Sequence, residues 1–281
     1  MSAPRVVEVG GVRFGDGGLS LIAGPCVVET EDLTLRTAEK VRSVAAKLGI
    51  PFVFKSSYRK DNRSSVDYYE GPGQEEGLRI LEKVRRETGV PVLSDVHTPD
   101  QVRAAAEVLD VLQIPAYLSQ QTELLLTAAR TGKPINIKKG QFVAPEDMLH
   151  SVRKVESVGN RSILLTERGS SFGYRTLVVD MRSLSILRGH GYPAVFDATH
   201  AVRVYGKPSA DPAGGTPEHI PLLARAAVAA GCDAVFLETH PEPAKALCDA
   251  ASQLPLARLE GLLAVLLRIH EAARGGGGGA S

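Results

Sequence analysis

Basic residues recur at the points where short apolar runs of the sequence end. Lys55 follows one such run, Lys138 a second and Arg168 a third. If these runs are strands of one parallel sheet, the three cations share an edge and repel one another unless an anion lies between them. Ammonium and guanidinium groups bind phosphate and carboxylate well. The pattern therefore indicates a phosphate or carboxylate ligand. A nucleotide is not the expected anion, because the sequence has no Walker loop or dinucleotide glycine fingerprint.

Four other residues are of types that bind metal ions. Cys26, His200 and Glu238 stand near the ends of three further apolar runs, and Asp249 follows the last of them. These are the first, seventh and eighth runs along the chain, which become neighbours only if the sheet closes into a barrel. A thiolate, an imidazole and carboxylates together suit Zn²⁺, Fe²⁺ or Mn²⁺. The set predicts a divalent metal site that is assembled from distant parts of the sequence.

Each of these residues also has a simpler interpretation. An intracellular cysteine such as Cys26 is often a small buried hydrophobic residue, and His200 could be a hydrogen-bonded histidine at a strand end. The sequence pattern leaves both alternatives open. Cys232 lies in an apolar stretch and is interpreted as part of the core, and Cys248 is interpreted as a packing residue beside Asp249.

The elements that would position these residues alternate along nearly the whole chain. Short β-rich runs are separated by amphipathic helical stretches such as Leu33–Leu48 and Glu75–Thr88. Eight such units predict an α/β fold, a single (β/α)₈ barrel, with its active site at the carboxyl ends of the strands. An open, doubly wound sheet is the structural alternative. The eight runs are Leu19–Val28, Pro51–Ser57, Pro91–His97, Val111–Ala116, Pro134–Gly140, Ser162–Gly169, Ala194–His200 and Ala234–His240.

Alternation along a strand predicts which side chains face the interior. Asn136 and Lys138 share one face of their run, so they are expected to point into the barrel and its mouth. Ile135, Ile137 and Leu165 are then expected to face the helices. Charged strand ends could also be ordinary solvated loop residues. That interpretation is less suited to a pattern that recurs at the ends of eight runs.

Three segments are predicted along the chain. Residues 1–18 form an extension containing a β-hairpin over Val6–Phe14, with its turn at Gly10-Gly11, which could close the bottom of the barrel. Residues 19–273 form the barrel. Residues 274–281 are a glycine-rich tail that is expected to be disordered.

Composition excludes several classes of function. The chain has 281 residues and a net charge of +1, so it has no overall electrostatic attraction to nucleic acid or to an anionic membrane. The N-terminus lacks the apolar core of a signal peptide, and no apolar run is long enough to span a bilayer. Three cysteines without CxxC spacing do not suggest a disulfide framework. We expect a cytoplasmic protein that acts on small molecules, with no nucleic acid or membrane partner.

Several motifs occur in order between about Leu21 and Glu271 and together resemble a known family. They are Ile22-Ala23-Gly24-Pro25-Cys26, Phe54-Lys55-Ser56-Ser57, Lys60-Asp61-Asn62-Arg63-Ser64-Ser65, Gln113-Ile114-Pro115-Ala116, Lys138-Lys139-Gly140-Gln141-Phe142, Thr166-Glu167-Arg168-Gly169, Asp197-Ala198-Thr199-His200 and Glu238-Thr239-His240-Pro241-Glu242-Pro243. This set is similar to that of the 3-deoxy-D-manno-octulosonate 8-phosphate synthases.

The resemblance implies a (β/α)₈ transferase, usually a homotetramer, of the biosynthesis of a lipopolysaccharide sugar. Such an enzyme condenses phosphoenolpyruvate with arabinose 5-phosphate and water and releases inorganic phosphate. Metal-dependent members carry Cys at the position of Cys26, where metal-independent members carry Asn. Cys26, His200, Glu238 and Asp249 all match, so the resemblance implies the metal-dependent branch.

The resemblance also implies roles for individual residues. Lys138 and Arg168 would hold the phosphate of phosphoenolpyruvate, and Lys60 would lie between the two substrates. Residues expected to take part directly in catalysis are Lys60, His200, Asp95 and Cys26. The residues expected to bind the substrates are Lys55, Lys60, Asn62, Arg63, Ser64, Asp95, His97, Gln113, Lys138 and Arg168.

Two positions depart from the family pattern. Gln120 stands where many relatives carry an arginine that reaches the sugar phosphate of a neighbouring subunit, and Glu70 replaces a basic residue. Because glutamine cannot form an ion pair with phosphate, we expect weaker binding of the sugar phosphate or compensation by another cation.

Other functions remain alternatives at this stage. The related synthase that uses erythrose 4-phosphate carries a Lys-Pro-Arg-Thr-Ser type motif where this chain has Lys60 to Ser64, and Asn62 favours the five-carbon sugar. A synthase acting on an unphosphorylated sugar is a less favoured alternative, because Arg63 is expected to bind a sugar phosphate. A non-catalytic barrel that binds anions or a metal is the alternative from another class.

Overall fold

The computed structural model describes residues 3–63, 65–208 and 211–275. Its centre is a parallel sheet in which each strand pairs with the next, and β10 pairs with both β9 and β3. The last pairing closes the sheet, so the prediction of a (β/α)₈ barrel is confirmed and the open sheet is wrong. The strands are β3 (Ser20–Gly24), β4 (Phe52–Lys55), β5 (Val92–Asp95), β6 (Val111–Ile114), β7 (Ile135–Lys138), β8 (Ile163–Glu167), β9 (Ala194–Asp197) and β10 (Ala234–His240).

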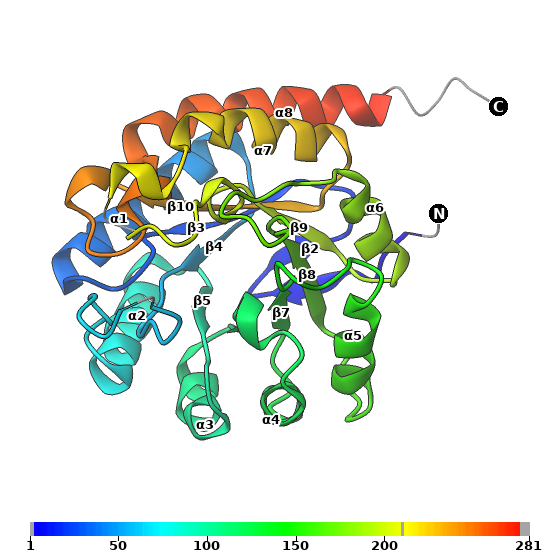
Figure 1. The fold of residues 1–281 in the computed structure, drawn as a ribbon, viewed down its shortest axis with the longest axis horizontal. Helices are drawn as coiled ribbons and strands as arrows, with labels where there is room; N and C mark the ends of the chain where they lie inside the picture. Colours follow the sequence, from blue (N-terminus) through cyan, green and yellow to red (C-terminus); the bar gives the residue numbers. More distant parts are fainter. Residues whose placement is uncertain (1–2, 64, 209–210, 276–281) are drawn as a thin grey trace.

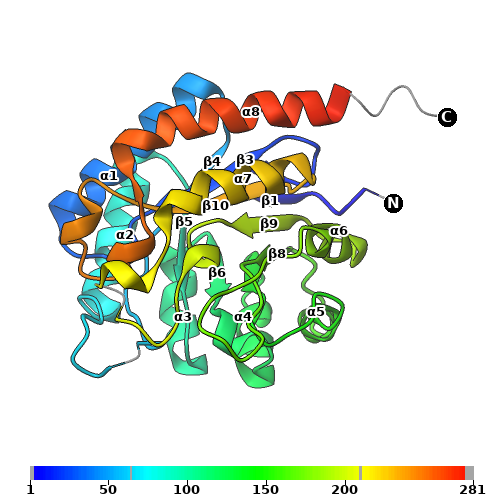
Figure 2. The same cartoon turned by 45° about the horizontal axis from the view of Figure 1, so that its top comes forward.

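Helices surround the barrel and pack on its outer face (Figure 1). The first helix, α1, shows how the sequence sets the helix ends. At its start the side chain of Thr30 accepts a hydrogen bond from the backbone N of Leu33, and at its end Gly49 adopts the left-handed conformation that ends the helix. Figure 2 shows α7 and α8 side by side. The helices are α1 (Glu31–Leu48), α2 (Gln74–Thr88), α3 (Pro99–Val108), α4 (Thr122–Arg130), α5 (Met148–Glu156), α6 (Arg182–Gly189), α7 (Ile220–Ala229) and α8 (Leu259–Gly275).

None of the described helices combines the length and apolar character needed to cross a membrane. Shorter elements occupy the connections at the carboxyl ends of the strands and near α8. They are η1 (Ala116–Leu118), η2 (His200–Val202), η3 (Pro212–Gly214), η4 (Pro217–His219), η5 (Pro243–Lys245), η6 (Ala250–Ser252), β11 (Leu254–Pro255) and η7 (Leu256–Arg258).

The strands are shorter than the apolar runs from which they were predicted. Strand β3 ends at Gly24, so Cys26 lies two residues beyond it, and β9 ends at Asp197, so His200 lies at the start of η2. The predicted runs therefore extend past the strands, and Cys26 and His200 stand in the connections that follow β3 and β9. The reason at β9 is local: one carboxylate oxygen of Asp197 accepts from the backbone N of Thr199 and of His200, which turns the chain out of the strand.

The hydrophobic core has two parts. The larger part lies between strands and helices and includes Ile135, Ile137 and Leu165, as predicted. The smaller part fills the inside of the barrel. Its strand residues are Ile22, Val53, Leu93, Val111, Leu164, Val195, Ala234 and Phe236.

The predicted N-terminal hairpin closes the inner core. Strands β1 (Val7–Val9) and β2 (Val12–Phe14) pair antiparallel, and Gly10 and Gly11 both have positive φ, as a tight hairpin turn requires. The apolar side chains of both strands are buried against the inner core of the barrel. At the other end of the chain α8 continues to Gly275, two residues past the predicted barrel boundary. Residues 276–281 of the predicted tail lie outside the described residues.

Candidate active site

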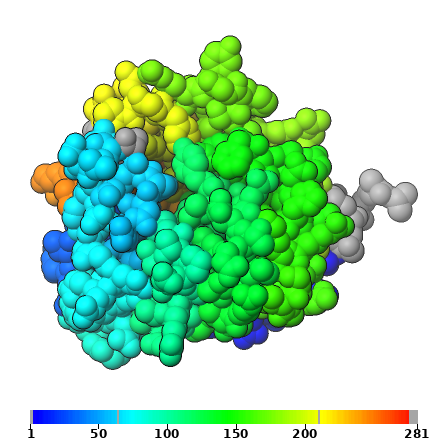
Figure 3. All heavy atoms as spheres, turned by 60° about the horizontal axis from the view of Figure 1, so that its bottom comes forward, coloured from blue at the N-terminus to red at the C-terminus, as the bar shows by residue number. Residues whose placement is uncertain are grey.

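A cleft of about 1030 Å³, counting the space at its open mouth, lies at the carboxyl ends of the strands. Its walls come from strands β4 to β7 and from the connections after β4, β6, β7, β8, β9 and β10. Figure 3 shows the face where the segment after β4 (light blue) and the segment after β9 (yellow) lie close together. Among the residues that the structure describes, seven cationic ones line the cleft, namely Lys55, Lys60, Arg63, Lys138, Arg168, Arg203 and Lys207.

Most of the residues predicted from the sequence meet in this cleft. The ones that line it are Lys55, Lys60, Asn62, Arg63, Asp95, Gln113, Lys138, Arg168, His200 and Asp249. Cys26 and Glu238 are buried next to the cleft, where they contact residues that line it. His97 is also buried and faces Asp61 rather than the cleft, with 3.8 Å between its Nδ1 and the carboxylate. Ser64 lies outside the described residues.

A chain of hydrogen bonds crosses the floor of the cleft from strand to strand. Ser57 donates to Asp95, and Gln113 Nε2 donates to the other oxygen of Asp95 at 2.5 Å. Asn136 Nδ2 donates to Gln113 Oε1 at 2.8 Å, and the hydroxyl of Thr166 donates to Asn136 Oδ1 at 2.6 Å. These side chains are all buried. The chain therefore fixes the amides of Gln113 and Asn136 in one orientation.

Two lysines at one side of the cleft share buried carboxylates. Lys55 Nζ lies 2.6 Å from Glu238 Oε1 and donates to the carbonyl of Cys26 at 2.8 Å. Lys60 Nζ lies 3.6 Å from Asp95 and 4.0 Å from Glu238. Burial disfavours the charged form of Lys60, but the negative charge of nearby Asp95 and Glu238 outweighs burial and holds the lysine pKa well above its ordinary value. Lys60 therefore stays protonated although it is buried.

Next to this group, Asp197 holds two functional side chains at once. Its Oδ2 lies 2.5 Å from Lys138 Nζ and 2.8 Å from His200 Nδ1. Burial disfavours its charge, but His200 and Lys138 outweigh burial and hold the pKa of Asp197 well below its usual range. The pKa of Lys138 is lowered, chiefly by burial, while Asp197 opposes the shift. No role was predicted for Asp197 from the sequence, where its only signal is its place in the motif that ends in His200.

Arg168 is held by an aromatic residue that the sequence analysis missed. Arg168 Nη2 donates to the hydroxyl of Tyr205 at 2.5 Å, and Gln141 Nε2 donates to the same oxygen at 3.0 Å. Arg168 Nη1 is buried and has no hydrogen-bond partner among the described residues. A buried, unpaired guanidinium nitrogen at the edge of a cleft is suited to an anionic ligand.

The backbone around Arg168 is held by a buried pair behind the cleft. Lys139 Nζ lies 3.5 Å from Glu167, and the same carboxylate accepts from the backbone N of Arg168 and of Gly169. Both charged side chains are almost completely buried. The pair therefore ties the end of β7 to the end of β8.

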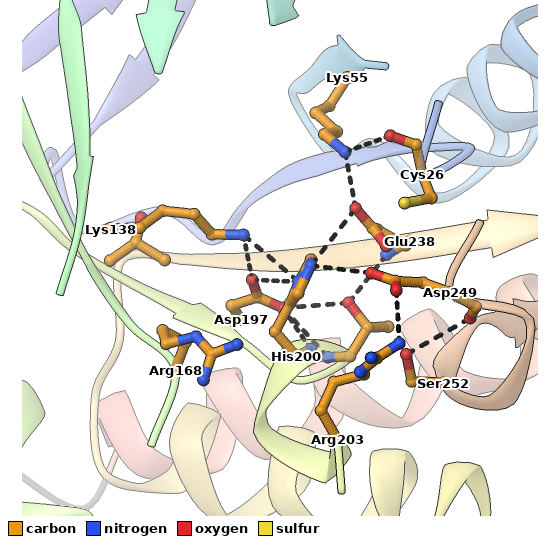
Figure 4. Close-up of polar contacts among 12 residues, drawn as sticks. Cys26, Lys55, Lys138, Arg168, Asp197, His200, Arg203, Glu238, Asp249 and Ser252 are labelled. Carbon is orange, nitrogen blue, oxygen red and sulfur yellow. Dashed lines mark hydrogen bonds and ion pairs between the residues drawn. The ribbon is translucent and has the colours of Figure 1, made fainter. Parts of the chain in front are cut away.

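The predicted metal ligands fall into two overlapping groups, one of which also contains Cys248. His200, Glu238 and Asp249 have ligand atoms within 4.8 Å of one another, and so do Cys26, Cys248 and Asp249. Figure 4 shows Asp249 in contact with both His200 and Arg203, and Arg203 forms an ion pair with the Asp249 carboxylate. The four residues predicted from the sequence are therefore close together around Asp249.

Three features of this cluster fit a bound cation. Glu238 Oε2 is buried without a hydrogen-bond partner among the described residues. Asp249 has a φ of 50°, the left-handed conformation that a non-glycine residue rarely adopts and that is concentrated at functional sites. Burial raises the pKa of Cys26 and the nearby carboxylates of Asp249 and Glu238 raise it further, and a bound cation would offset this local negative charge. A thiol, an imidazole and two carboxylates suit a divalent metal of the zinc or iron type.

The segment after β4 brings Arg63 to the cleft. Arg63 Nη1 donates to the carbonyl of Tyr68 at 3.0 Å and lies 3.0 Å from Glu70 Oε2. Glu70, one of the two departures from the family pattern, is thus the partner of Arg63. The other departure, Gln120, is exposed, and its backbone carbonyl accepts a hydrogen bond from Lys154 Nζ at 2.8 Å. Gln120 is not part of the cleft wall.

Comparisons with known proteins show the family of the chain. A family model described as the DAHP synthetase I family matches residues 5–273. Three relatives are each named 2-dehydro-3-deoxyphosphooctonate aldolase. The one from Acidithiobacillus ferrooxidans is 58% identical over 249 residues, which cover 89% of this chain and 88% of the relative. The one from a Geobacter species is 55% identical (94% and 97% covered), and the one from Trichlorobacter lovleyi is 54% identical (92% and 95% covered). The chain therefore belongs to the DAHP synthetase I family, in the group whose members are named 2-dehydro-3-deoxyphosphooctonate aldolase.

Proposed function

We propose that this chain condenses phosphoenolpyruvate with arabinose 5-phosphate and water to give 3-deoxy-D-manno-octulosonate 8-phosphate and inorganic phosphate. The observation that carries the proposal is the gathering of seven cationic residues in one cleft beside a cluster of metal-binding residues. The two substrates together carry two phosphates and a carboxylate. A cleft with several buried cations favours their simultaneous binding.

Phosphoenolpyruvate is assigned to the side of the cleft formed by β7 and β8. Lys138 and Arg168 would bind its phosphate, because Lys138 is buried beside Asp197 and Arg168 Nη1 has no partner among the described residues. Lys55 and Gln113 also line the cleft and would contact the rest of the molecule. Both are already oriented, Lys55 by Glu238 and Gln113 by the hydrogen-bond chain that crosses the floor.

The aldose phosphate is assigned to the segment after β4. Asn62 would contact the sugar hydroxyls, and Arg63 together with Ser64 would bind the sugar phosphate. Arg63 would then exchange its contact with the exposed Glu70 carboxylate for the phosphate. Asp95 would lie near the reacting sugar, with Lys60 between the two substrates.

The reaction needs positioning and charge stabilisation more than a nucleophile on the protein. The enol carbon of phosphoenolpyruvate attacks the aldehyde carbon and forms the new C–C bond. Water adds to the former enol phosphate carbon, whose bond to the phosphate oxygen breaks, and inorganic phosphate leaves. Fixed cations such as Lys60 and Lys138 stabilise charge that develops along this path, and binding both reactants in one cleft raises their effective concentration.

A divalent metal, Zn²⁺, Fe²⁺ or Mn²⁺, would be held by Cys26, His200, Glu238 and Asp249. The metal would orient the aldehyde or activate water. Asp197 supports this site from behind, because its contact with His200 Nδ1 leaves His200 Nε2 facing Glu238 and Asp249, at 3.7 Å and 3.5 Å.

The proposal is tested by measuring phosphate release from phosphoenolpyruvate with either arabinose 5-phosphate or erythrose 4-phosphate, before and after treatment with a chelator. We expect release with arabinose 5-phosphate, little with erythrose 4-phosphate, loss after chelation and recovery when the metal is restored. A preference for erythrose 4-phosphate would assign the chain to the alternative synthase. Tight ligand binding without turnover would indicate the non-catalytic barrel.

A further inference from the structure

Cys248 lies beside the predicted metal ligands in a position that packing does not explain. Its sulfur, the sulfur of Cys26 and a carboxylate oxygen of Asp249 lie within 4.8 Å of one another. Cys248 is only partly buried and lines the cleft, whereas Cys26 is almost completely buried. The interpretation of Cys248 as a packing residue therefore does not account for its place in the structure.

The backbone around Cys248 is held by hydrogen bonds. Gln253 Nε2 donates to the carbonyl of Cys248 at 2.8 Å, and Ser252 N donates to the carbonyl of Asp249 at 3.0 Å. Together with the left-handed conformation of Asp249, these bonds bring two adjacent side chains of metal-binding type to one place. Figure 4 shows Ser252 in this arrangement, next to Asp249.

We propose that Cys248 is a ligand of the metal and that the site contains two thiolates rather than one. The inference rests on the metal site of the proposed function and adds a ligand to it. Cys26, Cys248 and Asp249 form one side of the site, and His200 and Glu238 form the other, with Asp249 common to both groups. On binding, each thiol loses its proton to solvent as its sulfur bonds to the metal, and no oxidation or reduction takes place.

A second thiolate changes which metals the site prefers. Thiolates favour Zn²⁺ and other soft ions, whereas carboxylates and water favour Mn²⁺. The additional negative charge is compensated nearby, because Arg203 forms an ion pair with Asp249 and Lys60 lies in the same cleft. We therefore expect a site that binds Zn²⁺ and Co²⁺ much more tightly than Mn²⁺.

The direct test is a titration of the metal-free, reduced full-length chain with Co²⁺, in which near-ultraviolet charge-transfer absorbance reports thiolate bonds to the metal. We expect the absorbance per bound Co²⁺ to fall by about half in Cys248→Ser and by about half in Cys26→Ser. Cys232→Ala is the matched control, because Cys232 is buried in the outer core away from the cleft, and it should leave the absorbance unchanged. Full absorbance in Cys248→Ser together with reduced absorbance in Cys26→Ser would overturn the role of Cys248 while leaving the metal site intact.

A second measurement separates a ligand from a structural residue. Competition with a chelating dye should show that Cys248→Ser loses Zn²⁺ affinity on the order of 10- to 100-fold, the range seen when groups supporting a metal site are removed, and loses much less Mn²⁺ affinity. Equal losses for both metals, or none, would contradict the proposal. Cys248→Ala provides a second variant if serine perturbs folding. If no variant and no wild-type protein binds Co²⁺, the metal part of the proposed function fails as well, which is a different result from the failure of Cys248 alone.

Discussion

At the scale of single residues, the geometry of the cleft depends on side chains that position the groups expected to contact substrate. Asp197 contacts both Lys138 and His200, and Tyr205 accepts from both Arg168 and Gln141. None of the four contacts could be read from spacing in the sequence. They place the residues proposed to bind phosphate and the histidine proposed to bind the metal in fixed positions relative to one another.

Replacing Tyr205 with phenylalanine removes the oxygen shared by Arg168 and Gln141 and keeps the ring. Because a hydrogen bond to a charged group contributes about 1.5–3 kcal/mol, we expect phosphoenolpyruvate to bind about 10-fold more weakly, with a smaller effect on kcat. Calorimetric titration and steady-state kinetics measure the two effects. Tyr174→Phe is the control, because the side chain of Tyr174 is exposed on a nearby connection. Unchanged or tighter binding in Tyr205→Phe would show that the hydroxyl competes with the ligand.

Asp95 gives a prediction about pH. Burial disfavours its ionised form, but Lys60 and Lys55 outweigh burial and hold the pKa of Asp95 well below its ordinary value of about 3.9. A carboxyl group with a depressed folded-state pKa stabilises the protein above its unfolded-state pKa, and this stability is lost as the pH falls through the folded-state value. Urea unfolding should therefore show Asp95→Asn less stable than wild type at pH 7, with the difference shrinking below about pH 4. A difference that stays constant from pH 7 to pH 3 would contradict this account.

At the scale of elements, close contacts between neighbouring strands position the lysines. A Cβ atom at Gly24, the last residue of β3, would lie 2.0 Å from the backbone oxygen of Lys55, the last residue of β4, and Gly24 has a φ of +155°. Only glycine permits this approach. The hairpin β1–β2 contributes to stability at the other end of the barrel, where its apolar side chains fill the bottom.

Gly24→Ala should therefore damage both stability and function. The clash with the Lys55 backbone is expected to cost about 1–3 kcal/mol in the free energy of unfolding, as overpacked sites do, and to displace Lys55 from Glu238. Denaturant unfolding and the phosphate-release assay measure the two effects. Gly189→Ala, at the end of α6, is the matched control because a Cβ there meets no atom within 4 Å. A Gly24→Ala protein with wild-type stability and activity would show that the two strands can separate without consequence.

Much of the fold was predictable because hydrophobic runs mark strands directly. The eight barrel strands and the hairpin turn at Gly10-Gly11 follow from alternation and from glycine conformations. The strand ends were less predictable, since local hydrogen bonds such as those of Asp197 decide where the chain turns. Arg203, Tyr205 and Cys248 were missed as site residues because they lie in irregular connections, whose path depends on tertiary contacts that carry no periodic signal.

At the scale of the whole molecule, the surface near the cleft suggests assembly. Phe142, Phe172 and Tyr174 are 61%, 71% and 79% exposed, and they lie in the connections after β7 and β8. Exposed aromatic residues of this size often mark contacts between proteins. The homotetramer implied by the family resemblance would cover such a surface and stays a prediction.

Light scattering should give a mass about four times that of the 29.9 kDa chain. The double variant Phe142→Ser with Phe172→Ser should shift the protein to smaller species, whereas Leu222→Ser on α7 should not. A wild-type mass equal to one chain would contradict the tetramer. A tetramer that persists in the double variant would place the interface elsewhere.

One cleft at the mouth of the barrel is proposed to join the two phosphorylated substrates. The most direct test is a ³¹P magnetic resonance time course of the metal-loaded protein with phosphoenolpyruvate and arabinose 5-phosphate. We predict that the signals of both substrates decline together while inorganic phosphate and one new sugar phosphate ester appear in equal amounts. Inorganic phosphate without a new ester would mean hydrolysis of phosphoenolpyruvate, and an unchanged spectrum would mean no reaction. Either result would contradict the account.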